Sequence, residues 1–171
     1  MSSTVVLSIE GVLSTSKPGQ RLLNNDTIES GRLFYEFLKP SARIILLSSE
    51  RDDSMVRSWL VRERFNRYAG LHCYPGDNLD GYDSWKVQQI GWLISRGHHI
   101  GYYVDTSPGV VRDVMLQGVT SILLTYPAVY AGTGLRPNDR TYVGWEDLVE
   151  TVEEQNMLRA TVGVGGEDDG N

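Results

Sequence analysis

The fold is decided near the start of the chain by the stretch Val5-Val6-Leu7-Ser8-Ile9-Glu10-Gly11-Val12-Leu13. Its apolar run predicts a buried strand over residues 5–9. Ser8 and Glu10 stand two positions apart at the end of this run, so an extended backbone places both side chains on the same side. A Gly-Val-Leu turn follows. We therefore expect this polar pair at the carboxyl end of a buried strand, where parallel sheets bind ligands.

Similar apolar runs recur along the chain, and amphipathic stretches separate them. We predict further strands over residues 42–48, 71–74, 100–104 and 121–125, and helices over residues 27–38, 53–65, 84–95, 108–117 and 145–158. In the first helix, the spacing places Ile28, Leu33, Phe34 and Phe37 on one side. Strands that alternate with helices predict an α/β fold, with a mainly parallel five-stranded sheet covered on both faces.

The composition bounds the class of protein. The chain has 171 residues, of which 40% are hydrophobic and 22% charged, so it is long enough to bury its own core. Its net charge of −6 argues against nucleic acid or an anionic membrane as partner. Cys73 is the one cysteine, which excludes an internal disulfide and fits a reducing compartment. No apolar run approaches the roughly 20 residues that span a bilayer, so we expect a cytoplasmic protein.

The composition changes after Leu158. The last residues are rich in glycine and acidic side chains, as in Gly165-Gly166-Glu167-Asp168-Asp169. Such a segment has too few apolar groups to form a core of its own. We therefore predict one domain over residues 1–158 and a flexible acidic tail over residues 159–171.

Four short motifs give the chain a resemblance to the haloacid dehalogenase (HAD)-like superfamily, over nearly its whole length. The stretch Ser8–Leu13 is similar to motif one, which in that family reads Asp-x-Asp-Gly-Val-Leu. Ser48, which ends an apolar run, resembles the motif-two Ser or Thr that holds a phosphate oxygen. Lys86 resembles the motif-three Lys, and Asp105 the motif-four acid. The resemblance implies a three-layer Rossmann-like core with little or no cap domain, because the segments between motifs are short.

The end of the chain adds a second likeness. Residues 118–124, 136–137 and 144–149 are similar to segments of small HAD-like proteins of tailed bacteriophages. This likeness implies a phage protein that works in the host cytoplasm.

The resemblance also implies what the substitutions in motif one remove. In the active family members, the first Asp attacks phosphorus and the second protonates the leaving group, while the first Asp and the motif-four Asp bind Mg²⁺. Ser8 stands at the first of these positions, so a carboxylate nucleophile and a metal ligand are lost together. A hydroxyl is a poor nucleophile unless a neighbouring base takes its proton.

Glu10 leaves two possibilities open. It is close enough along the strand to act as a base for Ser8, and it is long enough to reach a metal ion. We reject Glu10 as the nucleophile, because Val12 would then take the acid/base position and cannot transfer a proton. Motif four also lacks the usual second acid, since Thr106 and Gly109 occupy the places where the family has it. The resemblance thus implies either no cofactor or a weak Mg²⁺ site on Asp105 and Glu10.

The same residues have structural interpretations. Ser8 and Ser48 can cap strand ends by bonding to nearby backbone groups. Lys86 can form an ion pair with Asp83 or Asp105. Asp105 can also begin the turn that follows it.

We therefore expect a HAD-like protein that has lost phosphatase activity and acts as a binding or scaffold protein, with a host or phage protein or a second copy of itself as partner. The alternative is a divergent Mg²⁺-dependent phosphohydrolase acting on nucleotide or polynucleotide phosphomonoesters. It would use the five family positions Ser8, Glu10, Ser48, Lys86 and Asp105.

Overall fold

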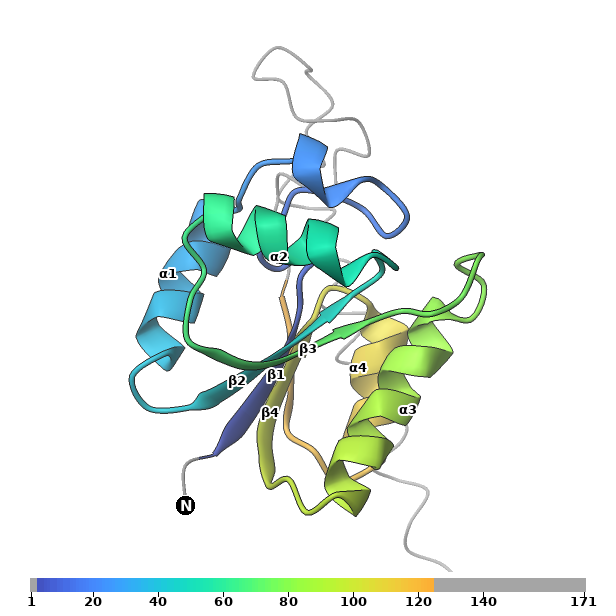
Figure 1. Cartoon of the computed structure of the whole chain (residues 1–171). Helices are drawn as coiled ribbons and strands as arrows, with labels where there is room; N and C mark the ends of the chain where they lie inside the picture. Colours follow the sequence, from blue (N-terminus) through green and yellow to red (C-terminus); the bar gives the residue numbers. More distant parts are fainter. Residues whose placement is uncertain (1–2, 125–171) are drawn as a thin grey trace, which may run out of the picture. The chain divides into compact units, whose positions relative to one another are not determined.

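The computed structural model describes residues 3–124 of the chain (Figure 1). Its strands are β1 (Thr4–Ser8), β2 (Arg43–Ser48), β3 (Tyr68–Cys73), β4 (Ile100–Asp105) and β5 (Ser121–Leu123). Its helices are α1 (Glu29–Leu38), α2 (Asp53–Arg62), α3 (Tyr82–Ser95) and α4 (Pro108–Met115), with a short 3-10 turn, η1 (Leu22–Asn24). The predicted helix over residues 145–158, the phage-like segments 136–137 and 144–149, and the acidic tail lie outside the described residues.

The five strands form one parallel sheet in the order β3-β2-β1-β4-β5. β1 lies at the centre, where Val5 is paired with Ile44 of β2 and with Tyr102 of β4. A parallel sheet brings the carboxyl ends of its strands to one edge, so the ends of β1, β2 and β4 are neighbours. The predicted α/β fold with a five-stranded parallel sheet is confirmed.

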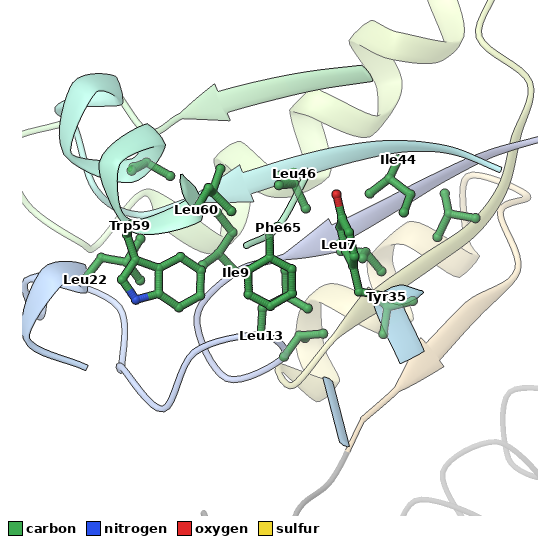
Figure 2. Packing of buried hydrophobic residues seen from close by; sticks show 14 residues of the cluster. Leu7, Ile9, Leu13, Leu22, Tyr35, Ile44, Leu46, Trp59, Leu60 and Phe65 are labelled. Carbon is green, nitrogen blue, oxygen red and sulfur yellow. The ribbon is translucent and has the colours of Figure 1, made fainter. Parts of the chain in front are cut away.

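Helices cover both faces of the sheet (Figure 1). Val5 and Leu7 of β1 point to the face covered by α1 and α2, whereas Val6 packs among residues of α3 and α4. Figure 2 shows the first of these cores, in which Trp59 and Phe65 stack with ring centroids 5.5 Å apart. Because both faces are buried, the middle of β1 and of β2 is apolar. At the carboxyl edge, β1, β2 and β4 end in the polar residues Ser8, Ser48 and Asp105.

The buried side of α1 differs from the prediction. The predicted apolar side of this helix includes Leu33 and Phe37, but they are 63% and 77% exposed, whereas Gly31 and Tyr35 are buried. A Cβ on Gly31 would collide with the carbonyl oxygen of Val12, so α1 approaches the turn after β1 as closely as only glycine allows. This contact decides which side of α1 faces the core.

The connection between β1 and α1 is a turn and loop without a cap domain, as the resemblance implies. Two contacts with α2 hold it: the Trp59 indole N–H donates to the Asn25 carbonyl at 3.1 Å, and the Arg62 guanidinium to the Leu23 carbonyl at 2.6 Å. The Thr27 hydroxyl adds a bond of 2.7 Å to Glu63. Within residues 3–124, no helix is long and apolar enough to cross a membrane.

Candidate functional site

The carboxyl edge of the sheet gathers all five family positions. Ser8, Ser48 and Asp105 end β1, β2 and β4, while Glu10 follows β1 by two residues and Lys86 lies in the first half of α3. All five are buried, none with more than 3% of its surface exposed. Within the described part of the chain, every buried side-chain nitrogen or oxygen has a hydrogen-bond partner. The five residues thus lie in a closed polar network.

Asp105 is the acceptor at the centre of one half of this network. Its Oδ2 accepts from the Ser8 hydroxyl and from the Lys86 ammonium, each at 2.8 Å, and from the Tyr103 hydroxyl. Its Oδ1 accepts from the backbone N–H of Ser107 at 2.8 Å, so Asp105 also begins the turn that leads into α4. Both carboxylate oxygens are therefore engaged by groups of the protein itself.

Lys86 makes both of the ion pairs proposed from the sequence. Besides Asp105, its ammonium lies 2.9 Å from Asp83, which is one helical turn earlier and largely exposed. The ammonium also lies 4.7 Å from the centre of the Tyr82 ring, a favourable position for a cation over an aromatic face. Lys86 is the cation that compensates the buried charge of Asp105.

Glu10 is the acceptor in the other half of the network. Its Oε1 accepts from the Ser48 hydroxyl at 2.7 Å and from the Ser49 backbone N–H at 3.0 Å, and its Oε2 from the Tyr82 hydroxyl at 3.1 Å. These donors are neutral, unlike the Lys86 ammonium. Burial raises the pKa of Glu10 above its ordinary value, and the hydrogen bonds from Ser48, Ser49 and Tyr82 oppose this shift only in part.

The two tyrosines act as permanent donors. Burial is the main cause that raises the pKa of Tyr82 and of Tyr103 well above 10, and the nearby carboxylates of Glu10 and Asp105 add to it. Both phenols therefore keep their protons over the whole physiological range. They hold the two carboxylates in place without competing for a proton.

Ser8 is not paired with Glu10. Its hydroxyl hydrogen is directed to Asp105, so the structure does not support Glu10 as the base for Ser8. Ser48 combines two roles, because its hydroxyl O–H donates to Glu10 and its oxygen accepts from the Glu50 backbone N–H at 3.1 Å. Ser48 thus bonds to a nearby backbone group at the end of its strand as well as to Glu10.

The residues present do not fit a Mg²⁺ ion. Mg²⁺ requires several hard oxygen ligands with free lone pairs in near-octahedral geometry. Asp105 Oδ2 already accepts from three side chains, and one of them, Lys86, is a cation. Glu10 is engaged with Ser48, Ser49 and Tyr82 instead. Among residues 3–124, no group of three or more His, Cys, Asp or Glu side chains is arranged for a metal.

A glycine brings motif one against motif four. Gly11 has a φ of +77°, and a Cβ at this position would lie 2.7 Å from the Thr106 hydroxyl oxygen. The turn after β1 can therefore pack directly on the residue that follows Asp105. This close approach fixes Glu10, the residue just before the turn.

Three loops that follow the carboxyl ends of β1, β2 and β3 are tied to one another. We call them the rim: residues 15–20, 49–52 and 74–81. The Gly19 backbone N–H donates to the Ser49 hydroxyl at 3.1 Å, and Gly19 also lies so close to Leu79 that a side chain there would clash. Arg51 forms an ion pair with Asp77. The rim links the ends of β1, β2 and β3.

The sequence reasoning missed three members of the network: Ser49, Tyr82 and Tyr103. Signals for the two tyrosines were present. Tyr103 precedes Asp105 by two positions on a strand and so shares its face, and Tyr82 precedes Lys86 by one helical turn. The role of Ser49 is carried by its backbone N–H, for which the side chain gives no signal.

Comparisons with known proteins show a likeness of fold and go no further. No protein-family model and no curated protein matches the chain. A chain of the Pnkp1/Rnl/Hen1 RNA repair complex is similar in structure, with a TM-score of 0.62 and 14% identity over 72% of this chain. A hydrolase from Streptococcus pneumoniae TIGR4 gives a TM-score of 0.49 and 9% identity, covering 77% of this chain and 98% of that one. This chain spans 42% of the chain from the repair complex.

Proposed function

We propose that this chain is a HAD-like protein that does not transfer phosphoryl groups and uses the fold as a scaffold to bind another protein. The observation that carries the proposal is the pairing of Glu10 with the Ser48 hydroxyl and the Ser49 N–H. The resemblance assigns Ser48 to the phosphate of a substrate. In this chain, the Glu10 carboxylate accepts the hydrogen bond from the Ser48 hydroxyl instead.

The pairing of Ser8 supports the same conclusion. A serine nucleophile needs a base that accepts its proton as the new bond forms. The acceptor here is Asp105 Oδ2, which also accepts from Lys86 and Tyr103. Three donors already share this oxygen and one of them is a cation, so Ser8 has no free base.

Charge and burial work in the same direction. An incoming phosphomonoester is an anion and would have to displace the Glu10 carboxylate from its three donors. The Lys86 ammonium, which would attract the anion, is already shared between Asp83 and Asp105. The side chains at the five positions bind groups of the protein itself and so stabilise the fold, whereas the side chains of an active site would have to bind substrate.

The binding role is supported by the surface of α1. Leu33 and Phe37 lie one helical turn apart and are 63% and 77% exposed. Neighbouring apolar side chains left in solvent are typical of a contact surface for another protein. A second copy of the chain and a different protein are both compatible with this surface.

An activity assay tests the loss of catalysis. Purified protein is incubated with Mg²⁺ and p-nitrophenyl phosphate, and separately with 5′- and 3′-phosphorylated oligonucleotides. We expect no release of phosphate above the rate of an Asp105→Asn variant. An Asp113→Asn variant is the matched control, because Asp113 is an acid of α4 outside the network. Turnover that Asp105→Asn abolishes and Asp113→Asn retains would replace the scaffold proposal.

That outcome would favour the second candidate, a divergent phosphohydrolase acting on nucleotide or polynucleotide ends. It is kept because Ser8, Lys86 and Asp105 are directly hydrogen-bonded at the carboxyl edge of the sheet. The structural likeness to a chain of an RNA repair complex names the substrates to try first.

Analytical ultracentrifugation tests self-association through α1. If a second copy is the partner, wild-type protein dimerises in a concentration-dependent way and a Leu33→Ser/Phe37→Ser variant is monomeric. Leu116→Ser is the matched control, since Leu116 is 73% exposed at the end of α4. A wild-type protein that stays monomeric excludes self-association and leaves a different protein as the partner.

A further inference from the structure

The connection between α2 and β3 carries two arginines in an unusual backbone conformation. Arg64 has a φ of 61° and Arg67 a φ of 65°, and within residues 3–124 no other residue except glycine has a positive φ. This left-handed region is favourable for glycine and unfavourable for any residue with a Cβ. The backbone alone would therefore favour glycine at both positions, so the arginine side chains need another explanation.

The inner side of this connection is fixed by the core. Phe65 is 3% exposed and stacks on Trp59. The Asn66 carbonyl accepts from the Tyr35 hydroxyl of α1 at 2.7 Å, and the connection runs beside this helix (Figure 1). The two arginines, in contrast, are exposed. They therefore extend into solvent from a loop whose position is set by buried contacts.

Neither arginine is used by the fold. Arg57 and Arg62 of α2 form ion pairs with acidic neighbours, at 2.9 and 2.6 Å. The side chains of Arg64 and Arg67 have no hydrogen bond, ion pair or ring contact with the residues that the structure describes. Their charges are therefore available to a ligand.

Arg43 adds a third cation of the same kind. It begins β2, is exposed, and likewise has no side-chain partner among residues 3–124. β2 and β3 are paired with Ile44 opposite Tyr68, so Arg43 and Arg67 stand side by side just before this pair. Neighbouring strands lie about 5 Å apart and three steps along a chain cover at most about 11 Å, so the Cα atoms of the three arginines lie within about 16 Å. We call Arg43, Arg64 and Arg67 the arginine patch.

The acidic side chains of the elements around the patch are already paired. Glu63 accepts from the Thr27 hydroxyl at 2.7 Å and lies 3.5 Å from the Arg32 guanidinium. In α1, which packs against the connection, Glu36 is paired with Lys39 at 2.5 Å. The patch is therefore a local concentration of positive charge on a chain whose net charge is −6.

We propose that the arginine patch binds an acidic segment of a partner protein. This inference rests on the proposed binding role and deepens it, because it names the chemistry by which the partner is recognised. A guanidinium group binds a carboxylate through two parallel hydrogen bonds. Because the loop is fixed before the encounter, little entropy is lost in presenting Arg64 and Arg67.

The small size of the patch favours an acidic segment over nucleic acid. Salt limits the reach of exposed charges to about 8 Å at physiological ionic strength, so the patch attracts a short cluster of negative charges. A nucleic acid strand would extend beyond the patch over a chain with net negative charge, which would repel it. A few neighbouring Asp or Glu side chains meet no such penalty.

The test is fluorescence anisotropy of the full chain with a fluorescein-labelled oligoglutamate peptide at low ionic strength. Arg64→Gly/Arg67→Gly is the test variant, and Arg21→Ala/Arg112→Ala is the control, which loses the same two charges elsewhere. We expect saturable binding to wild-type protein and an affinity lower by about tenfold or more in the test variant. The control should keep the wild-type affinity, and sodium chloride should weaken binding to both.

Thermal unfolding separates recognition from a role in the fold. Glycine is favoured at a positive φ, so the test variant should keep or raise the Tm of wild-type protein while it loses affinity for the peptide. A lower Tm would show that the two arginines serve the fold, and would overturn the inference.

Three results of the binding assay would also overturn it. One is the absence of saturable binding to wild-type protein, and another is an equal loss of affinity in the test variant and the control. The third is a single-stranded oligonucleotide that binds more tightly than the peptide and only when both arginines are present, which would make nucleic acid the ligand.

The outcome for the proposed loss of catalysis is independent of these measurements. Phosphate release by wild-type protein would contradict that loss even if the peptide binds to the arginine patch. An inactive protein that does not bind the peptide would contradict only the assignment of the patch.

Discussion

The Ser8 hydroxyl donates a hydrogen bond of 2.8 Å to Asp105 Oδ2, which joins the ends of two neighbouring strands. In the family that the chain resembles, two carboxylates occupy these places and share a metal ion. Here one is an alcohol, and the pair needs no ion to be stable. The exchange converts two groups that repel each other into a donor and an acceptor.

The first prediction reverses this exchange. Ser8→Asp places a second buried carboxylate beside Asp105, with Lys86 as the shared cation, and should lower the free energy of unfolding by about 2 kcal/mol or more. Ser8→Ala only removes one donor and should cost about 1 kcal/mol. Urea unfolding measures both values. Millimolar Mg²⁺ should raise the Tm of Ser8→Asp and not that of wild-type protein; a rise in both would contradict our conclusion that the native residues do not fit Mg²⁺.

The second prediction concerns the buried cation. Lys86→Met keeps the length of the side chain but leaves Asp105 with an uncompensated charge, so unfolding should become easier by about 3–5 kcal/mol. Asp83→Asn removes the exposed partner of the same lysine and should cost less than about 1 kcal/mol. Chemical unfolding compares the two. Similar small losses in both variants would show that Asp105 does not depend on Lys86.

The third prediction is a pH dependence of stability. Burial raises the folded-state pKa of Glu10 above its ordinary value of 4.5, so the folded state holds the Glu10 proton more tightly than the unfolded state does. The contribution of this group is therefore fully present below pH 4.5 and is lost as pH rises through the raised pKa. The difference in unfolding free energy between wild-type protein and Glu10→Gln, measured by urea titration over a pH series, should follow this course. A flat difference would contradict the assignment.

The fourth prediction tests the close approach of α1 to the turn after β1. Gly31→Ala forces a methyl group into the Val12 carbonyl, and because both partners are backbone, the loss should be about 2–4 kcal/mol. Gly109 in α4 has no atom within 4 Å of the place of a Cβ. Gly109→Ala should therefore raise stability by about 0.4–1 kcal/mol. Thermal unfolding distinguishes the two variants. Equal effects would show that the Val12 carbonyl does not obstruct a methyl group at position 31.

The periodicity of the sequence was enough to predict the fold. Strands buried on both faces appear as continuous apolar runs, and the structure has strands at all five predicted places. The edge strand β3 extends three residues earlier than predicted, over Tyr68-Ala69-Gly70, because pairing with β2 recruits residues with little strand preference of their own. The buried side of α1 was not predictable either, since it depends on the contact between Gly31 and Val12.

The residues of the candidate site were found because they stand at strand ends, which a parallel sheet brings to one edge. Their pairing could not be read from the sequence. Ser8 lies two residues from Glu10 along the chain, yet its partner is Asp105. Glu10 instead reaches across the sheet edge to Ser48 at the end of β2. Sequence spacing predicts on which side of a strand a residue lies. Which donors pair with Glu10 and which with Asp105 depends on how Tyr82 and Lys86 pack.

The rim has a consequence for any molecule that docks on the carboxyl edge of the sheet. Gly19 is bonded to Ser49, Arg51 is paired with Asp77, and the loop after β1 is tied to α2 through Trp59. A ligand would meet a surface whose shape is set before the encounter, so little conformational entropy is lost on association. A partner that binds there must therefore match the shape that this surface already has in the free protein.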